Sequence, residues 1–247
     1  MKEYDFLVNG YEVHAVYPTH FIKEAYQLIQ QWRDLAQRQK QRVVIFLAAP
    51  PGAGKSTMAL LFEQLSHDQN GPSLQALGMD GFHRYQKYIL THDVNVKGVL
   101  RPMKEVKGCP ESFDFDRLFC YVQQLKKNAV LQWPVYDRRL HDVVDDQLEV
   151  YAPIVLLEGN YLLLDEDPWR KLKAFCDDSI FLLADEKQVR MRLIQRKMQG
   201  GMMPHEAAAF CEQSDLVNVR RILEHRLSAQ TLLLFKEDTY FIQKKNK

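Results

Sequence analysis

The chain has 247 residues, of which 46% are apolar and 26% are charged. This composition is ordinary for a globular protein and excludes a disordered or collagenous chain, and the length allows one large domain or one and a half at roughly 150 residues per domain. Lysine and arginine number 33 against 32 aspartates and glutamates, so the net charge is +1. Such a balance gives no general attraction to nucleic acid or anionic lipid, and we expect neither as a partner.

Three features of the sequence favour a cytoplasmic protein. Residues 1–5 contain acidic side chains and lead into no long apolar run, so they do not have the pattern of a signal peptide. No apolar run approaches the roughly 18 residues of a membrane span. The four cysteines are scattered without CxxC spacing, which suits a reducing compartment better than a disulfide scaffold or a zinc site.

The N-terminal segment predicts a β-hairpin followed by a helix. Two short strand-like stretches, residues 6–8 and 11–16, flank Asn9-Gly10, a dipeptide that accepts positive φ at both turn positions. Apolar residues then recur at helical spacing over residues 21–36, and Pro18-Thr19 stands where such a helix should begin.

From residue 43 onward, short apolar runs alternate with helical patterns. The run at residues 43–48 is continuous and begins with β-branched side chains, as expected of a strand that is buried on both faces. Further strands are expected at residues 73–79, 154–157 and 179–183, and helices at residues 55–66, 115–126 and 186–198. This alternation predicts a parallel sheet covered by helices on both faces, with ligands bound at the carboxyl ends of the strands.

The division of the chain follows from the same patterns. Residues 37–42 are polar and predict a bridge between the first helix and the alternating pattern. We therefore expect an N-terminal extension of residues 1–42 and a main domain of residues 43–247. The C-terminal apolar runs at residues 231–235 and 240–242 predict one or two edge strands.

A phosphate-binding loop follows the first buried strand. Residues 49–57 match the pattern [AG]xxxxGK[ST] in its required place between a strand and a helix. Its glycines let backbone N–H groups surround phosphate oxygens, and the helix N-terminus adds a partial positive charge. Lys55 is expected to reach the β- and γ-phosphates, and the Ser56 hydroxyl to ligate Mg²⁺. The expected nucleotide-binding residues are Pro51, Gly52, Ala53, Gly54, Lys55, Ser56 and Thr57.

Two acidic residues at strand ends indicate how the nucleotide is used. The chain has no NKxD element that would read guanine, and the strand at residues 154–157 ends in the single acid Glu158 instead of the acidic pair usual in motor ATPases. Glu158 can hold a Mg²⁺ water or position the γ-phosphate. Asp80 follows the strand at residues 73–79, where a kinase for small alcohols needs a carboxylate to accept the hydroxyl proton.

In their order along the chain, these motifs resemble the phosphoribulokinase/uridine kinase/bacterial pantothenate kinase superfamily. The motifs are the phosphate-binding loop, residues 80–83, residues 134–137 and residues 158–160. Residues 107–114 and 158–165 are similar in particular to a bacterial branch of nucleoside-triphosphate hydrolase-domain or fructose-transport-system kinase-like proteins. The resemblance spans about residues 43–226. It implies a three-layer α/β P-loop sandwich with a parallel sheet of strand order 2-3-1-4-5, ATP as phosphate donor, Mg²⁺, Asp80 as catalytic base and Glu158 near the metal.

The resemblance also indicates an acceptor site. Tyr136 and His141 match a tyrosine and a histidine that uridine–cytidine kinases place around the nucleoside. Those enzymes carry an aromatic residue two positions after the tyrosine, where this chain has Arg138. Together with Arg139, this difference favours an anionic or polyhydroxylated acceptor over a stacked base. His83 lies close enough to Asp80 to contact the acceptor, although an ordinary turn histidine is an equal alternative.

A basic helix resembles the lid of this superfamily. Residues 186–197 carry five basic side chains and end at Gly200-Gly201, a helix stop or hinge that completes an expected lid at residues 186–201. Arg192 and Arg196 lie four residues apart on one face, and in the lid such arginines clamp the triphosphate and stabilise charge in the transition state. The alternative is a solvated basic face, the usual meaning of a charge run.

The sequence therefore predicts a kinase that transfers the γ-phosphate of ATP to a hydroxyl of a small metabolite, with a sugar or sugar phosphate favoured. A nucleoside or a pantothenate-like acceptor stays open, as does an ATP-binding regulatory module or an ATPase without an acceptor. The expected catalytic residues are Asp80, Lys55, Glu158, Arg192 and Arg196, the acceptor residues His83, Tyr136, Arg138, Arg139 and His141, and the metal ligands Ser56 and Glu158. Homodimer formation is left open by these residues.

Overall fold

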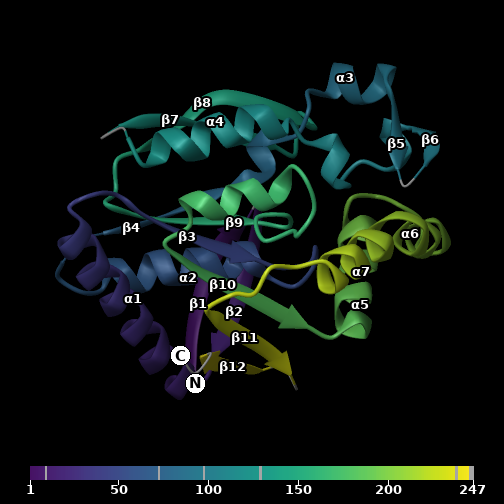
Figure 1. Ribbon diagram of the computed structural model, residues 1–247. Coiled ribbons are helices and arrows are strands. Elements are labelled where there is room, and N and C mark those ends of the chain that lie inside the picture. Colours follow the sequence, from purple (N-terminus) through teal and green to yellow (C-terminus); the bar gives the residue numbers. More distant parts are fainter. Residues whose placement is uncertain (9, 72, 97, 128–129, 237–238, 245–247) are drawn as a thin grey trace.

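The computed structural model describes residues 1–8, 10–71, 73–96, 98–127, 130–236 and 239–244. Its centre is a six-stranded sheet in the order β12-β11-β10-β3-β9-β4 (Figure 1). The strands are β3 (Val43–Ala48), β4 (Leu74–Gly78), β9 (Ile154–Gly159), β10 (Asp178–Ala184), β11 (Thr231–Lys236) and β12 (Thr239–Lys244). All neighbours are parallel except β12, which pairs antiparallel with β11 at the edge. Numbered from the first buried strand, the parallel order is 2-3-1-4-5, which confirms the expected P-loop fold.

Helices cover both faces of this sheet, and β3 shows why. Every residue of β3 is buried, and side chains alternate between the two faces of a strand. Val43, Ile45 and Leu47 belong to a core formed with α1 (Thr19–Gln39) and α2 (Lys55–His67). The other three side chains of β3 belong to a second core, on the side of α4 (Phe115–Leu125) and the 3₁₀ segment Trp169–Phe175. The three expected layers are therefore present.

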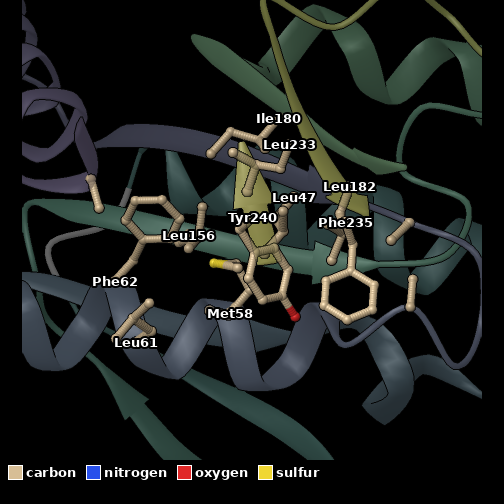
Figure 2. Packing of buried hydrophobic residues seen from close by; sticks show 14 of the residues in the cluster. Leu47, Met58, Leu61, Phe62, Leu156, Ile180, Leu182, Leu233, Phe235 and Tyr240 are labelled. Carbon is tan, nitrogen blue, oxygen red and sulfur yellow. The ribbon is translucent and has the colours of Figure 1, made fainter. Parts of the chain in front are cut away.

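The first core is the one that supports the phosphate-binding loop. Figure 2 shows Met58, Leu61 and Phe62 of α2 lying against sheet side chains that include Leu47 and Leu156. Each of these residues has at most 1% of its surface exposed. Burial of a side chain of this size contributes about 1.5–3 kcal/mol, so the start of α2 is held firmly against the end of β3.

The N-terminal hairpin and helix are present. Strands β1 (Lys2–Val8) and β2 (Tyr11–Tyr17) pair antiparallel from Lys2↔Tyr17 to Val8↔Tyr11, and Gly10 has the expected positive φ of 85°. Asn9, the other expected turn residue, lies outside the described residues. Helix α1 continues to Gln39, so the bridge predicted at residues 37–42 begins too early. Gln and Arg are good helix formers, and their polarity marked a solvent-facing last turn instead of the helix end.

Two hairpins and a short helix occupy parts of the chain where no regular element was expected. Helix α3 (Gln86–Thr91) and the hairpin of β5 (Asp93–Val96) and β6 (Val99–Pro102) lie between Asp80 and the helix expected at residues 115–126. Strands β7 (Leu131–Asp137) and β8 (Asp142–Val150) form a second hairpin, whose register shifts between Trp133 and Val135. Pro134 lies at this shift, where a residue without a backbone N–H is tolerated. Because proline is rare inside strands, no strand was expected here.

The C-terminal part of the domain continues the lid region. Helix α5 (Glu186–Gln199) is followed by α6 (Pro204–Phe210), a π-helical turn (Cys211–Asp215) and α7 (Leu216–Glu224). Within the part of the chain that the structure describes, no helix is both long and apolar enough to cross a membrane.

Candidate active site

The phosphate-binding loop joins β3 to α2 at the carboxyl edge of the sheet. Gly52 and Gly54 have φ values of 81° and 95°, which residues other than glycine rarely adopt. A Cβ on Gly52 would lie 2.9 Å from Cγ of Leu193, so helix α5 packs directly on the loop. The loop, the start of α2 and the expected lid thus form one anion-binding corner.

The parallel register brings Glu158 to this corner. Glu158 pairs with Leu47 of β3 on one side and with Gly78 of β4 on the other, so it lies where these strands end. Ser56 Oγ donates a hydrogen bond of 2.8 Å to Glu158 Oε1, and Lys55 Nζ lies 3.8 Å from Glu158 Oε2. Burial raises the pKa of the Glu158 carboxyl, with Lys55 acting in the opposite direction.

Magnesium fits this donor set. Mg²⁺ prefers oxygen ligands and in nucleotide sites is held by one or two protein groups together with phosphate oxygens. Ser56 and Glu158 offer a hydroxyl and a carboxylate oxygen within hydrogen-bonding distance of each other. Among the described residues, no group of three or more His, Cys, Asp or Glu side chains is arranged so that it could hold a metal ion.

The second acid, Asp80, lies on the 3₁₀ turn Met79–Phe82 that follows β4. Close packing fixes this turn: a Cβ on Gly81 would be 2.1 Å from the carbonyl oxygen of Pro134 in β7. Arg138 Nη2 lies 3.9 Å from Asp80 Oδ2. Burial opposes ionisation of Asp80, but the basic groups of His83, Lys55, Arg138 and Arg196 outweigh it and lower the pKa of the carboxyl. The site therefore holds two acids with pKa values shifted in opposite directions.

Three of the expected acceptor residues gather around Asp80. His83 Nδ1 lies 2.9 Å from the carbonyl oxygen of Asp80, which fits a hydrogen bond from the ring, and the His83 ring centroid is 5.4 Å from that of Tyr136. Burial lowers the pKa of His83 and raises that of Tyr136 to about 12, so both rings are expected to be neutral near pH 7. Arg138 completes the group through its ion pair with Asp80.

The other two expected acceptor residues are placed differently. His141 is exposed and lines the outer part of the cavity at the turn between β7 and β8, where its φ is 54°. The side chain of Arg139 is 92% exposed and pairs with Asp137 at 3.3 Å. Arg139 therefore does not join the site, because the turn directs neighbouring side chains to different sides of the hairpin.

The basic residues of the expected lid helix differ in what they contact. Arg192 lies with its guanidinium carbon 4.3 Å from the centroid of the Phe235 ring, and its Nη1 is 3.5 Å from the carbonyl oxygen of Ala53 in the loop. Arg196 faces the same cavity. Arg190 instead pairs with Glu212 at 2.6 Å, while Lys197 pairs with Asp215 at 3.0 Å.

The phosphate-binding loop, the β7–β8 turn, α5 and the N-terminal hairpin line a cavity of about 790 Å³, which is within the range of ligand pockets. Its basic side chains come from the loop, the β7–β8 turn and α5; they are Lys55, Arg138, Arg192, Arg196 and Lys197. Among the described residues that line it, no aspartate or glutamate occurs. A polyanion such as a triphosphate suits this cavity. A smaller hollow of about 280 Å³ adjoins it and contains Asp80, Glu158 and Ser56 in its wall.

Several further residues belong to this site that were not among the expected site residues. Lys107 donates a hydrogen bond of 2.8 Å to the hydroxyl of Tyr136 and so fixes that ring. Tyr240 of β12 and Tyr17 of β2 line the larger cavity, and a Cβ on Gly54 would be 3.5 Å from the Tyr240 hydroxyl. No local pattern marks these tyrosines, because they reach the loop only through sheet pairing and packing.

The chain is similar to known proteins in sequence and in fold. Residues 44–201 match the model of the Phosphoribulokinase / Uridine kinase family. Over 234 residues, 94% of both chains, the protein is 39% identical to YggC, an uncharacterised protein of Escherichia coli K12. It is 31% identical to a pantothenate kinase of Ligilactobacillus salivarius over 64% of this chain and 50% of that one. A crystal structure from Silicibacter sp. TM1040, provisionally assigned as a fructose transport system kinase, superposes with a TM-score of 0.72 at 30% identity, covering 83% of this chain and 98% of that one.

Proposed function

Because the chain belongs to the phosphoribulokinase/uridine kinase family of P-loop kinases, we propose that it transfers the γ-phosphate of ATP to a hydroxyl group of a small metabolite. The observation that carries this proposal is the position of Asp80. Its carboxylate lies beside Arg138 at the edge of the basic cavity and shares the smaller hollow with Ser56 and Glu158. An ATPase or a regulatory module without an acceptor has no need of this second acid.

The residues of the site divide the chemistry between them. The loop amides, Lys55 and the arginines of α5 bind the triphosphate and stabilise the charge that develops on the transferred group. Ser56 and Glu158 would hold Mg²⁺, which when bound neutralises charge on the β- and γ-oxygens. Asp80 orients the acceptor hydroxyl and accepts its proton. Its lowered pKa keeps it ionised, and therefore able to accept a proton, at neutral pH.

The acceptor in this proposal is polyhydroxylated or anionic, with sugars and sugar phosphates among the candidates. Support for this choice comes from Arg138, whose guanidinium is at the acceptor side of the cavity. Arg139 adds nothing to it, because its side chain points into solvent. We also place the reaction in the cytoplasm, since Cys109, Cys120, Cys176 and Cys211 are all free thiols, as suits a reducing compartment.

The proposal is tested by ATP turnover with a panel of hydroxylated metabolites. One class of compound should raise ADP release many-fold above the rate with ATP alone. Asp80→Asn keeps the shape of the side chain but cannot accept the proton, so it should lower acceptor-dependent kcat by about 10²–10⁴-fold. ATP binding by calorimetry should stay within a few-fold, because Lys55 and the loop are unchanged. A variant that keeps more than about a third of the wild-type acceptor turnover would remove Asp80 from its role as the base.

A further inference from the structure

The N-terminal hairpin lies outside the matched family region, yet it forms part of the wall of the active site. The family match begins at residue 44, whereas β1 and β2 span residues 2–17. In Figure 1 the hairpin lies beside α2, and β1 packs against that helix. Val8 at the end of β1 lines both the basic cavity and the smaller hollow that contains Asp80. The end of this hairpin therefore meets the site where the acceptor hydroxyl must react.

Aromatic packing holds the base of the hairpin in place. Tyr17 is 1% exposed, and its ring centroid lies 5.7 Å from that of Phe21 in α1 and 5.3 Å from that of Tyr240 in β12. Tyr4 adds an edge contact to Tyr17 at 6.0 Å. Aromatic pairs of this kind contribute about 0.5–1.5 kcal/mol each beyond their buried area. The hairpin is thus a fixed wall, anchored near the loop and extending toward Asp80.

The register of the hairpin decides which side chains face inward. Residues directly opposite each other in an antiparallel pair point to the same face, so Phe6 and Val13 share a face with Val8 and Tyr11. Phe6 packs against the core beneath α2, and Val13 and Tyr11 line the basic cavity. At the free end, Tyr11 lines the basic cavity although its large side chain is 51% exposed. Leu7, which is 70% exposed, alternates to the opposite face of β1.

The smaller hollow differs in character from the basic cavity. Beside Ser56, Asp80 and Glu158, its wall includes the partly exposed apolar side chains of Val8, Leu60, Val135 and Leu148. Among its described lining residues there is no lysine or arginine, and its charged groups are Asp80 and Glu158. A hollow of about 280 Å³ with these walls offers a phosphate no cation, while its apolar side chains can cover an aliphatic portion of a ligand.

We propose that the N-terminal hairpin is a specificity element of the acceptor site and that the hollow it closes binds an apolar portion of the acceptor. This inference rests on the proposed kinase function and narrows it. The acceptor presents its hydroxyl to Asp80, directs any anionic group toward Arg138, and places an aliphatic portion against Val8. Binding then covers apolar side chains that are partly exposed in the free protein.

The first test needs no turnover and uses two diol probes. Glycerol and 1,2-hexanediol share a vicinal diol, but only hexanediol carries an aliphatic chain. Each buried methylene contributes about four-fold to affinity, so burial of two should give hexanediol an advantage of about fifteen-fold over glycerol in saturation-transfer NMR titrations. Equal affinities of the two diols would overturn the proposal.

Matched variants then test whether the preference for hexanediol over glycerol depends on the hairpin. Val8→Thr keeps the shape and the strand preference of valine but introduces a hydroxyl, and it should reduce the hexanediol preference at least about three-fold. Val99→Thr is the control, since Val99 is 59% exposed on β6 and lines neither hollow. Equal effects of Val8→Thr and Val99→Thr would place the probe elsewhere and overturn the proposal.

The second test uses whichever compound of the metabolite panel stimulates ADP release. Val8→Thr should raise the acceptor KM at least about three-fold, whereas Val99→Thr should leave it within two-fold of wild type. An unchanged acceptor KM would refute the role of the hairpin while leaving the kinase function intact. If no compound stimulates the wild type, the proposed function fails instead, and the diol titrations still decide whether the hairpin forms an apolar binding wall.

Discussion

Two adjacent arginines provide a matched pair for testing the acceptor site. The sequence gives Arg138 and Arg139 equal standing, whereas the structure directs only Arg138 toward Asp80. Arg138→Ala removes the guanidinium whose Nη2 is 3.9 Å from the Asp80 carboxylate. Arg139→Ala removes the same chemistry one residue away, from a side chain that is 92% exposed. Any difference between the two variants reports on position alone.

The expected change in the acceptor KM follows from the distance between Arg138 and Asp80 and from the exposure of the two side chains. Two unit charges about 4 Å apart interact with about 4 kcal/mol at an effective dielectric constant of 20. The side chains of Arg138 and Asp80 are each 32% exposed, so solvent screening reduces the contribution to about 1–2 kcal/mol. A charge-assisted hydrogen bond from Arg138 to an anionic or hydroxyl group of the acceptor, screened to the same extent, contributes a similar free energy of about 1–2 kcal/mol, so Arg138→Ala should raise the acceptor KM about 5–30-fold.

The assay is the dependence of ADP release on acceptor concentration at saturating ATP. Arg139→Ala should stay within about two-fold of wild type, and the KM for ATP should change little in either variant. Arg138→Lys keeps the charge but not the planar fork, so its acceptor KM should fall between those of Arg138→Ala and wild type. The reasoning would be refuted if both alanine variants raised the acceptor KM equally, or if neither did.

Three further predictions concern the loop, the Asp80 turn and pH. Lys55→Ala should abolish the thermal stabilisation by ATP, because it removes the charge that faces the β- and γ-phosphates; an undiminished shift in Tm would contradict the assignment. Gly81→Ala places a Cβ 2.1 Å from the carbonyl oxygen of Pro134, and overpacking of about 1–3 kcal/mol should lower Tm by roughly 2–12 °C in calorimetry, so an unchanged Tm would argue against this close contact. Burial lowers the folded-state pKa of His83, so its contribution to stability is complete above about pH 6.5 and is lost as the pH falls toward the folded-state pKa. His83→Asn should therefore flatten the decline in unfolding free energy between about pH 7 and 5, measured by urea titration, and a decline as steep as in wild type would exclude this role.

Local sequence was sufficient to predict the phosphate-binding loop and the parallel strands of the sheet. A continuous apolar run, a glycine-rich loop and a helix follow one another within residues 43–67, so their contacts are set by neighbours in the chain. The same alternation predicted the parallel strands, and the strand order followed from the resemblance to known kinases. Asp80 and Glu158 were predictable for a related reason, since residues that follow parallel strands must meet at one edge.

The β7–β8 hairpin could not be derived in this way. Pro134 argues against a strand unless a register shift accommodates it, and such a shift depends on the partner strand. The turn that follows then decides that Arg138 reaches Asp80 and that Arg139 reaches solvent. Residue type was the same at both positions, so only the path of the backbone could separate them.

The N-terminal hairpin shows most clearly which features local sequence determines and which depend on tertiary packing. Its strands were predicted at residues 6–8 and 11–16, and the structure has both, although β1 begins earlier, at Lys2. Its place was not predicted, because Tyr17 contacts Tyr240 from the opposite end of the chain and Val8 reaches a hollow built from α2, β4 and β7. Local sequence determined the elements and the phosphate-binding chemistry, since these depend on backbone preferences and short spacing. Tertiary packing decided what surrounds the acceptor, since that wall is assembled from segments that meet only in the folded chain.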